Sequence, residues 1–203
     1  MIGIVDYGVG NLFSLQSSLK AVGADPVVSS DPELLMKADK ILLPGVGAFG
    51  DAAEKLRKTG LQQVVLEQAK KGTPLLGICL GMQLLFEKSY EYGTHPGLSL
   101  IPGTVAPIQG KVPAHYKIPH IGWNSLIFPD QRSPLFRDLN QGDHVYFVHS
   151  YAAVDCDAYV SARTEYGALL TAAAEKDNVF GCQFHPEKSG PVGLKILGAF
   201  CSL

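Results

Sequence analysis

The chain has 203 residues, of which 46% are hydrophobic and 18% are charged, and its formal net charge is −2. This length and composition are typical of one globular domain, so we expect a single domain over residues 1–203. The small net charge and the lack of a basic run leave little attraction for a nucleic-acid backbone or an anionic membrane surface. We therefore expect neither nucleic acid nor membrane as a partner.

The chain begins with MIGIVDYG, which has neither the basic segment nor the cleavage site of a signal peptide. No apolar run approaches the roughly 18 residues of a membrane span. The four cysteines, at positions 79, 156, 182 and 201, follow no CxxC or Cys/His metal spacing. We expect a cytoplasmic protein with reduced cysteines, no disulfide bond and no bound metal.

Up to Tyr92 the chain alternates between strand and helix patterns. The predicted strands are Ile2–Val5, Pro26–Val28, Ile41–Leu43 and Pro74–Ile78. The predicted helices run from Asn11, as the N-cap, to Val22 and then over Ala52–Lys70 and Leu80–Lys88. Short strands that alternate with helices predict a parallel sheet with helices on both faces.

After Tyr92 prolines and glycines become frequent, and short β patterns replace helices. Here we predict strands over Val145–Val148, Tyr159–Arg163, Leu169–Ala173 and Val179–Phe184, and a last helix over Val192–Phe200. The predicted fold class is α/β, with a mixed, mostly parallel sheet flanked by helices.

The residues GICLG at positions 77–81 join an apolar strand to a helix. This is the pattern of a nucleophile elbow, with Cys79 in the place of the serine. Glycines are needed two positions either side of the nucleophile because the turn is tight and side chains there would collide. The start of a helix also favours a thiolate. The alternative is an inert, buried cysteine at the end of a strand.

A cysteine nucleophile needs a base, and the base needs an orienting group. The residues GCQFHPE at positions 181–187 follow a predicted strand and contain both, in His185 and Glu187. His185 lies where the strand ends, at the sheet edge where active-site groups collect. A lone histidine is more often structural, but its combination with the elbow favours a catalytic triad of Cys79, His185 and Glu187.

Acyl transfer also needs hydrogen-bond donors for the developing oxyanion. The backbone N–H of Leu80, directly after the nucleophile, is one candidate. The glycine-rich loop at residues 43–47 is the other, because Gly45 and Gly47 let its backbone reorient. We expect the Val46 N–H to serve as the second donor in one orientation of the Gly45–Val46 peptide.

Together these segments resemble the class I (triad-type) glutamine amidotransferases, in which a cysteine and an HPE pair hydrolyse glutamine through a thioester. Within that class the chain is similar to the glutaminase subunits of imidazole glycerol phosphate synthases, which act in histidine biosynthesis. The likeness covers nearly the whole chain and includes DYGVGNL (6–12), PGVGAF (44–49), GICLGMQLLF (77–86), GLSLIPGTV (97–105), HIGWN (120–124), FVHSY (147–151) and FHPEKS (184–189). Ser99 stands where a glycine is commoner in the family.

The resemblance implies further roles. Glutamine would contact Gly45, Gly47, Gln83, Ser150 and Tyr151, and the partner subunit would contact Pro119, Ile121, Trp123 and Lys188. The partner would be a (β/α)8-barrel cyclase that consumes the ammonia, and no cofactor would be needed. Without the resemblance, Gln83 could be a solvated helix residue, Trp123 part of the core, and His120 and His149 ordinary packed histidines.

Three alternatives remain at this level. The chain could be the glutaminase subunit of another class I amidotransferase, for example in anthranilate or pyridoxal phosphate synthesis. It could be an inactive interaction module that keeps the fold, or an esterase-like cysteine hydrolase built on the same elbow. The DYGVGNL segment argues against the first alternative, and the intact Cys79, His185 and Glu187 argue against the second.

Overall fold

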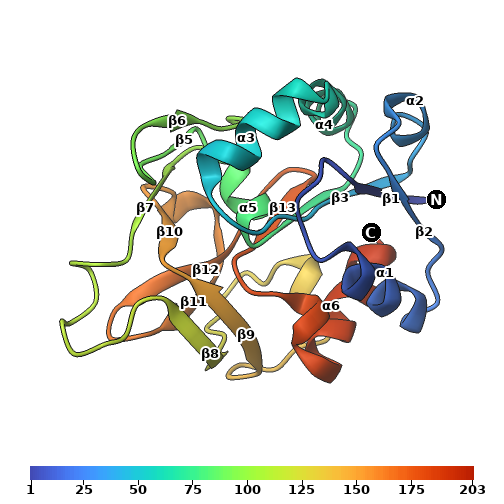
Figure 1. The fold of residues 1–203 in the computed structure, drawn as a ribbon. Helices are drawn as coiled ribbons and strands as arrows, with labels where there is room; N and C mark the ends of the chain where they lie inside the picture. Colours follow the sequence, from blue (N-terminus) through green and yellow to red (C-terminus); the bar gives the residue numbers. More distant parts are fainter.

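A computed structural model describes residues 1–203. Its central sheet has seven strands in the order β11-β12-β13-β4-β3-β1-β2 (Figure 1). These strands are β1 (Ile2–Val5), β2 (Pro26–Ser29), β3 (Lys40–Leu43), β4 (Leu75–Ile78), β11 (Val160–Glu165), β12 (Leu169–Lys176) and β13 (Val179–Cys182). All neighbours from β13 to β2 pair in parallel, whereas β12 and β11 add antiparallel pairs. The predicted mixed, mostly parallel sheet is therefore confirmed.

Helices cover both faces of this sheet (Figure 1). One face carries α2 (Pro32–Leu35), α3 (Phe49–Lys58), α4 (Leu61–Lys70) and α5 (Leu80–Leu84), and the other carries α1 (Leu12–Ala21) and α6 (Gly190–Cys201). Successive strand residues alternate between the two cores: Leu43 packs with the first set of helices and Leu42 with the second. None of the helices has the length and apolar character needed to cross a membrane.

The single helix predicted over Ala52–Lys70 is wrong. The structure has two helices there, α3 and α4, separated at Thr59 and Gly60. Gly60 has a φ of 76°, which favours glycine, and its N–H bonds the Arg57 carbonyl and closes α3. The apolar spacing continues across the break because both helices pack on the same face of the sheet.

The helix predicted over Leu80–Lys88 is too long, because α5 ends at Leu84. In a longer helix the backbone carbonyls of Leu84 and Leu85 would accept hydrogen bonds from within the helix. Here they accept hydrogen bonds from residues 98–101 instead. Leu98 N–H bonds the Leu84 carbonyl at 2.8 Å, and Leu100 N–H bonds the Leu85 carbonyl at 2.9 Å. In the same segment Ser99 has a φ of 54°, which gives a backbone reason for the glycine common at this position in the family.

The part of the chain after α5 also builds two smaller sheets, and of their strands the sequence patterns predicted only the one over Val145–Val148, which the structure extends to His144–His149. One is a four-stranded sheet in the order β10-β7-β5-β6, and the other is the hairpin β8-β9. Their strands are β5 (Lys88–Ser89), β6 (His95–Pro96), β7 (Thr104–Pro107), β8 (His120–Ser125), β9 (His144–His149) and β10 (Tyr151–Val154). Three 3₁₀ turns complete the fold: η1 (Pro134–Phe136), η2 (Asp157–Tyr159) and η3 (Pro186–Lys188).

Candidate active site

Cys79 lies in the sharp turn between β4 and α5, with a φ of 55° and a ψ of −110°. This left-handed backbone is strained for a residue with a side chain. A Cβ atom at Gly81 would lie 1.8 Å from the Leu43 carbonyl oxygen, and one at Gly77 would lie 2.6 Å from the Gly81 carbonyl oxygen. The predicted need for glycine at both positions is confirmed, because backbone atoms occupy the space of their side chains.

His185 and Glu187 form a buried pair directly after β13. Nδ1 of His185 lies 2.8 Å from Oε1 of Glu187, and their side chains are 2% and 4% exposed. The carboxylate occupies Nδ1, which leaves Nε2 as the nitrogen available to the Cys79 sulfur. Burial lowers the pKa of His185, but hydrogen bonds and charge attraction from Cys79 and Glu187 outweigh it and raise this pKa to about 9. The arrangement favours an imidazolium beside the Cys79 sulfur at neutral pH.

We expect Glu187→Gln to lower glutamine hydrolysis by roughly 10²–10⁴-fold, less than loss of the nucleophile. The amide removes the negative charge that holds the pKa of His185 high, so this pKa falls and less imidazolium remains at neutral pH. Steady-state rates across a pH series measure the effect. Glu54→Gln, at an exposed residue paired with Lys58, is the matched control. Activity equal to that of the control would contradict the role of Glu187.

A cavity of about 300 Å³ opens onto the sulfur of Cys79. Most residues expected to be catalytic, to donate to the oxyanion or to bind glutamine line it: Val46, Gly47, Cys79, Leu80, Gln83, Ser150, Tyr151 and His185. Gly45 and Glu187 do not line the cavity, although both contact residues that do. Gln83 is buried, not solvated, and its side-chain amide donates to the Tyr151 carbonyl at 3.2 Å. The cavity fits an amino-acid-sized substrate beside a cysteine.

The two expected oxyanion donors are not both free in this conformation. The Leu80 N–H donates to the Gly45 carbonyl at 3.3 Å. This carbonyl belongs to the Gly45–Val46 peptide, so the Val46 N–H of that planar peptide points the opposite way. The structure therefore places a carbonyl acceptor beside the Leu80 N–H, where the sequence predicted a second donor.

Two polar side chains with no role assigned from the sequence also belong to the site. Glu91 is an acidic residue in the cavity lining, and its Oε2 accepts from the Phe49 N–H at 2.6 Å. Gln183 is completely buried, with Nε2 3.8 Å from the Cys79 sulfur. No spacing pattern pointed to Glu91, whereas Gln183 lies inside the GCQFHPE segment, two residues before His185.

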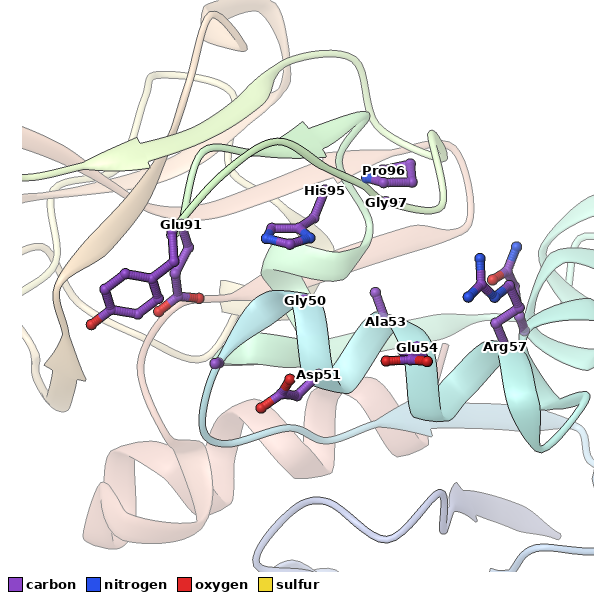
Figure 2. Close-up of a pocket in the computed structure, with 12 residues that line it drawn as sticks. Gly50, Asp51, Ala53, Glu54, Arg57, Glu91, His95, Pro96 and Gly97 are labelled. Carbon is purple, nitrogen blue, oxygen red and sulfur yellow. The ribbon is translucent and has the colours of Figure 1, made fainter.

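A larger cavity of about 730 Å³ lies between α3 and residues 91–97 (Figure 2). Its polar lining includes Asp51, Glu54, Arg57 and His95, and it shares Glu91 with the cysteine cavity. It has no cysteine or serine that could attack a carbonyl. We therefore assign the chemistry to the smaller cavity. The fold brings together no group of three His, Cys, Asp or Glu side chains that could hold a metal ion.

The other three cysteines differ from Cys79 in their surroundings. Burial raises the pKa of Cys156, Cys182 and Cys201, so these thiols stay protonated at neutral pH. We expect a thiol-alkylating analogue of glutamine to label Cys79 alone, and excess glutamine to protect it. Peptide mass mapping after partial labelling tests this, and similar labelling of all four cysteines would contradict it.

Three of the four residues expected to face a partner lie on one contiguous surface next to the cavity. Ile121 and Trp123 are exposed on β8, and Pro119, just before this strand, reaches the cavity lining. The Trp123 ring lies 6.0 Å from that of Tyr146, whose carbonyl accepts the N–H of His185. The fourth residue, Lys188, is exposed at the end of η3, which contacts β9. The mouth of the cavity is thus bordered by exposed apolar side chains.

The class of protein is shown by comparison with known families and structures. The chain matches the family model "Glutamine amidotransferase class-I" over residues 3–201. A solved glutamine amidotransferase is 19% identical with a TM-score of 0.74, covering 95% of this chain and 94% of that one. PurLQS from Thermotoga maritima is 21% identical with a TM-score of 0.75, covering 99% and 97%. At these identities the two structures show the fold alone. The chain is a class I glutamine amidotransferase.

Closer relatives are similar along their full length. The imidazole glycerol phosphate synthase subunit HisH of Wolinella succinogenes is 49% identical over 205 residues, covering 100% of both chains. The HisH subunit of a Geobacillus strain is 50% identical (100% and 97% covered), and that of Aquifex aeolicus is 49% identical (97% and 94% covered). Within its class, the chain belongs to the family of imidazole glycerol phosphate synthase HisH subunits. The resemblance predicted from the motifs is confirmed.

Proposed function

We propose that this chain is the glutaminase subunit of an imidazole glycerol phosphate synthase. It hydrolyses glutamine to glutamate and ammonia at Cys79 and passes the ammonia to a (β/α)8-barrel cyclase subunit in histidine biosynthesis. The observation that carries the proposal is the buried 2.8 Å contact between His185 and Glu187, behind a cavity that opens onto a strained elbow cysteine.

The reaction follows from these positions. The Cys79 thiolate attacks the carboxamide carbon of glutamine, and the C–N bond breaks as the His185 imidazolium gives its proton to the leaving nitrogen. The product at this stage is a thioester and free ammonia. A water then attacks the thioester carbon while His185 takes its proton. The C–S bond breaks, glutamate leaves and the thiolate returns.

The cavity also has groups suited to the amino-acid end of glutamine. Glu91 is a carboxylate that can pair with the substrate's α-ammonium group, as charged partners do when shielded from water. Gln83 and the backbone around Ser150 and Tyr151 offer hydrogen-bonding groups close by. An ester hydrolase would need neither this charge nor these hydrogen-bonding groups, so this lining favours glutamine over an activated ester.

Delivery to a partner is supported by the surface beside the cavity. Pro119, Ile121 and Trp123 form an exposed apolar strip that begins at the cysteine cavity, and Lys188 is exposed separately on η3. A cyclase seated on this strip would cover the exit taken by ammonia. The relatives named HisH are subunits by name, which supports a partner subunit over an unrelated acceptor. A cytoplasmic location stays a prediction from cysteine usage.

An isotope experiment tests both hydrolysis and delivery. Glutamine labelled with ¹⁵N in its amide is given to the complex together with excess unlabelled ammonium and the acceptor substrate. We expect imidazole glycerol phosphate to carry mainly ¹⁵N, because ammonia formed at Cys79 does not equilibrate with the solution. Product that carries mainly unlabelled nitrogen would contradict delivery, and absence of glutamate would contradict the glutaminase reaction.

A further inference from the structure

Gln183 lies between β13 and His185, and no part of its side chain reaches the surface. Both ends of its carboxamide are close to other functional groups. Oε1 accepts a hydrogen bond from Nε2 of Gln83 at 3.0 Å, and Nε2 lies 3.8 Å from the Cys79 sulfur. The side chain therefore joins a residue of the glutamine cavity to the nucleophile.

The direction of this carboxamide follows from its neighbours. The carbonyl of Tyr151 can only accept, and it lies 3.2 Å from the Gln83 amide, so Nε2 of Gln83 must face it. The second N–H of that Nε2 then points to Gln183, which must present Oε1. The other end of Gln183, an N–H donor, is thereby directed at the sulfur of Cys79.

The other groups around the Cys79 sulfur show how the Gln183 amide affects the charge state of this sulfur. The Val148 carbonyl oxygen lies 3.9 Å from the sulfur and can accept a hydrogen bond from a thiol, but its negative end repels a thiolate. Besides the imidazole of His185, the Gln183 amide is the side-chain donor placed against the sulfur. A hydrogen bond to the charged form of a buried group favours that form.

We propose that Gln183 is a further catalytic residue: its amide N–H donates to the Cys79 sulfur and stabilises the thiolate that attacks glutamine. The hydrogen bond to Gln83 keeps the Gln183 amide in this direction. Gln83, which contacts the substrate, therefore also orients the donor that bonds the nucleophile. The inference rests on the proposed role of Cys79, but its test uses the thiol alone.

The test measures the rate at which iodoacetamide alkylates Cys79 at a series of pH values, in the full chain bound to its partner. Gln183→Leu removes the donor, and Gln183→Glu keeps the shape but turns a carboxylate oxygen toward the sulfur. We expect the midpoint of the alkylation profile to rise by about one to two pH units in both variants, with equal rates at high pH. Gln68→Leu is the control, since Gln68 is a buried amide that bonds the Leu35 and Ala38 carbonyls away from the site.

The other titratable groups near the sulfur are His185 with Glu187 behind it, His149 and Glu91 in the cavity, and Tyr7 beneath the elbow. Gln183→Leu leaves all of these groups in place, so a shifted midpoint in that variant reports the missing amide donor. Gln183→Glu adds a carboxylate, so its shift also includes the repulsion between that charge and the thiolate. An unchanged midpoint in a folded variant would overturn the role of Gln183 without touching the glutaminase proposal. If neither variant folds, ¹⁵N NMR of the unaltered protein decides: the Gln183 side-chain amide signal must titrate with Cys79, and a signal that does not move overturns the inference.

Discussion

We expect the Cys79→Ala chain to hydrolyse glutamine about 10⁴–10⁶-fold more slowly than the unaltered chain, measured as glutamate release by the complex. Alanine removes the atom that forms the thioester, and no other cysteine lies in the cavity. Water would have to attack the carboxamide directly, with help only from the groups that bind and polarise it. The substitution adds no atoms to the turn, so the fold should not change.

Two controls make this result specific. The Cys79→Ala complex should still make imidazole glycerol phosphate when ammonia is supplied in solution, because the cyclase chemistry does not use this cysteine. Cys201→Ala, at a partly buried cysteine near the chain end, should keep glutaminase activity unchanged. Substantial glutamine hydrolysis by the Cys79→Ala protein would exclude the triad of Cys79, His185 and Glu187.

The second large effect concerns activation by the partner. We expect the isolated chain to hydrolyse glutamine about 10²–10³-fold more slowly than the chain bound to a cyclase that holds its own ligand. In the isolated chain the Gly45 carbonyl accepts the Leu80 N–H at 3.3 Å, so this N–H is not free to donate to an oxyanion. Turning over the Gly45–Val46 peptide would remove this acceptor and direct the Val46 N–H into the site. Losing one such donor costs about 2.7–4 kcal/mol.

The surrounding contacts confine this movement to one peptide. Tyr7 donates its hydroxyl to the Pro44 carbonyl at 2.8 Å, and Glu91 accepts the Phe49 N–H at 2.6 Å, so both ends of the loop are held. Between them Gly47 has a φ of 93°, which glycine adopts readily. If two orientations of the Gly45–Val46 peptide lie within a few kcal/mol of each other, binding of the partner can shift the population from one to the other.

Val46→Pro tests the donor directly, because proline has no N–H. We expect this variant to lose most of the activation by the liganded partner while the activity of the isolated chain changes little. Val46→Ala keeps the N–H and trims a partly exposed side chain, so it should be activated normally. The informative quantity is the ratio of glutaminase rates with and without the liganded cyclase. An unaltered chain that works equally fast alone would exclude the switch, and normal activation of Val46→Pro would exclude Val46 as its donor.

The sequence alone predicted features that depend on neighbours in the chain. The elbow is an example. Gly77 and Gly81 approach backbone atoms closely because the strand–helix turn is tight, and the two glycines in the sequence indicate this turn. The contact between His185 and Glu187 is equally local, since only Pro186 lies between them in sequence. The alternation of strand and helix patterns predicted the parallel sheet, because the apolar spacing within each segment reflects which of its side chains are buried between the sheet and the helices.

Only the tertiary structure decided features that depend on distant segments. Residues 97–101 set the end of α5, because their N–H groups donate hydrogen bonds to the backbone carbonyls at and just after the end of this helix. No local sequence pattern at Leu84 predicts this. The Gly45 carbonyl meets the Leu80 N–H because β3 and β4 are neighbours in the sheet. Gln83 and Gln183 are 100 residues apart in sequence yet share a hydrogen bond. Residue types and local spacing specify which chemistry is possible, whereas the direction of each donor is set by the partners that the fold brings to it.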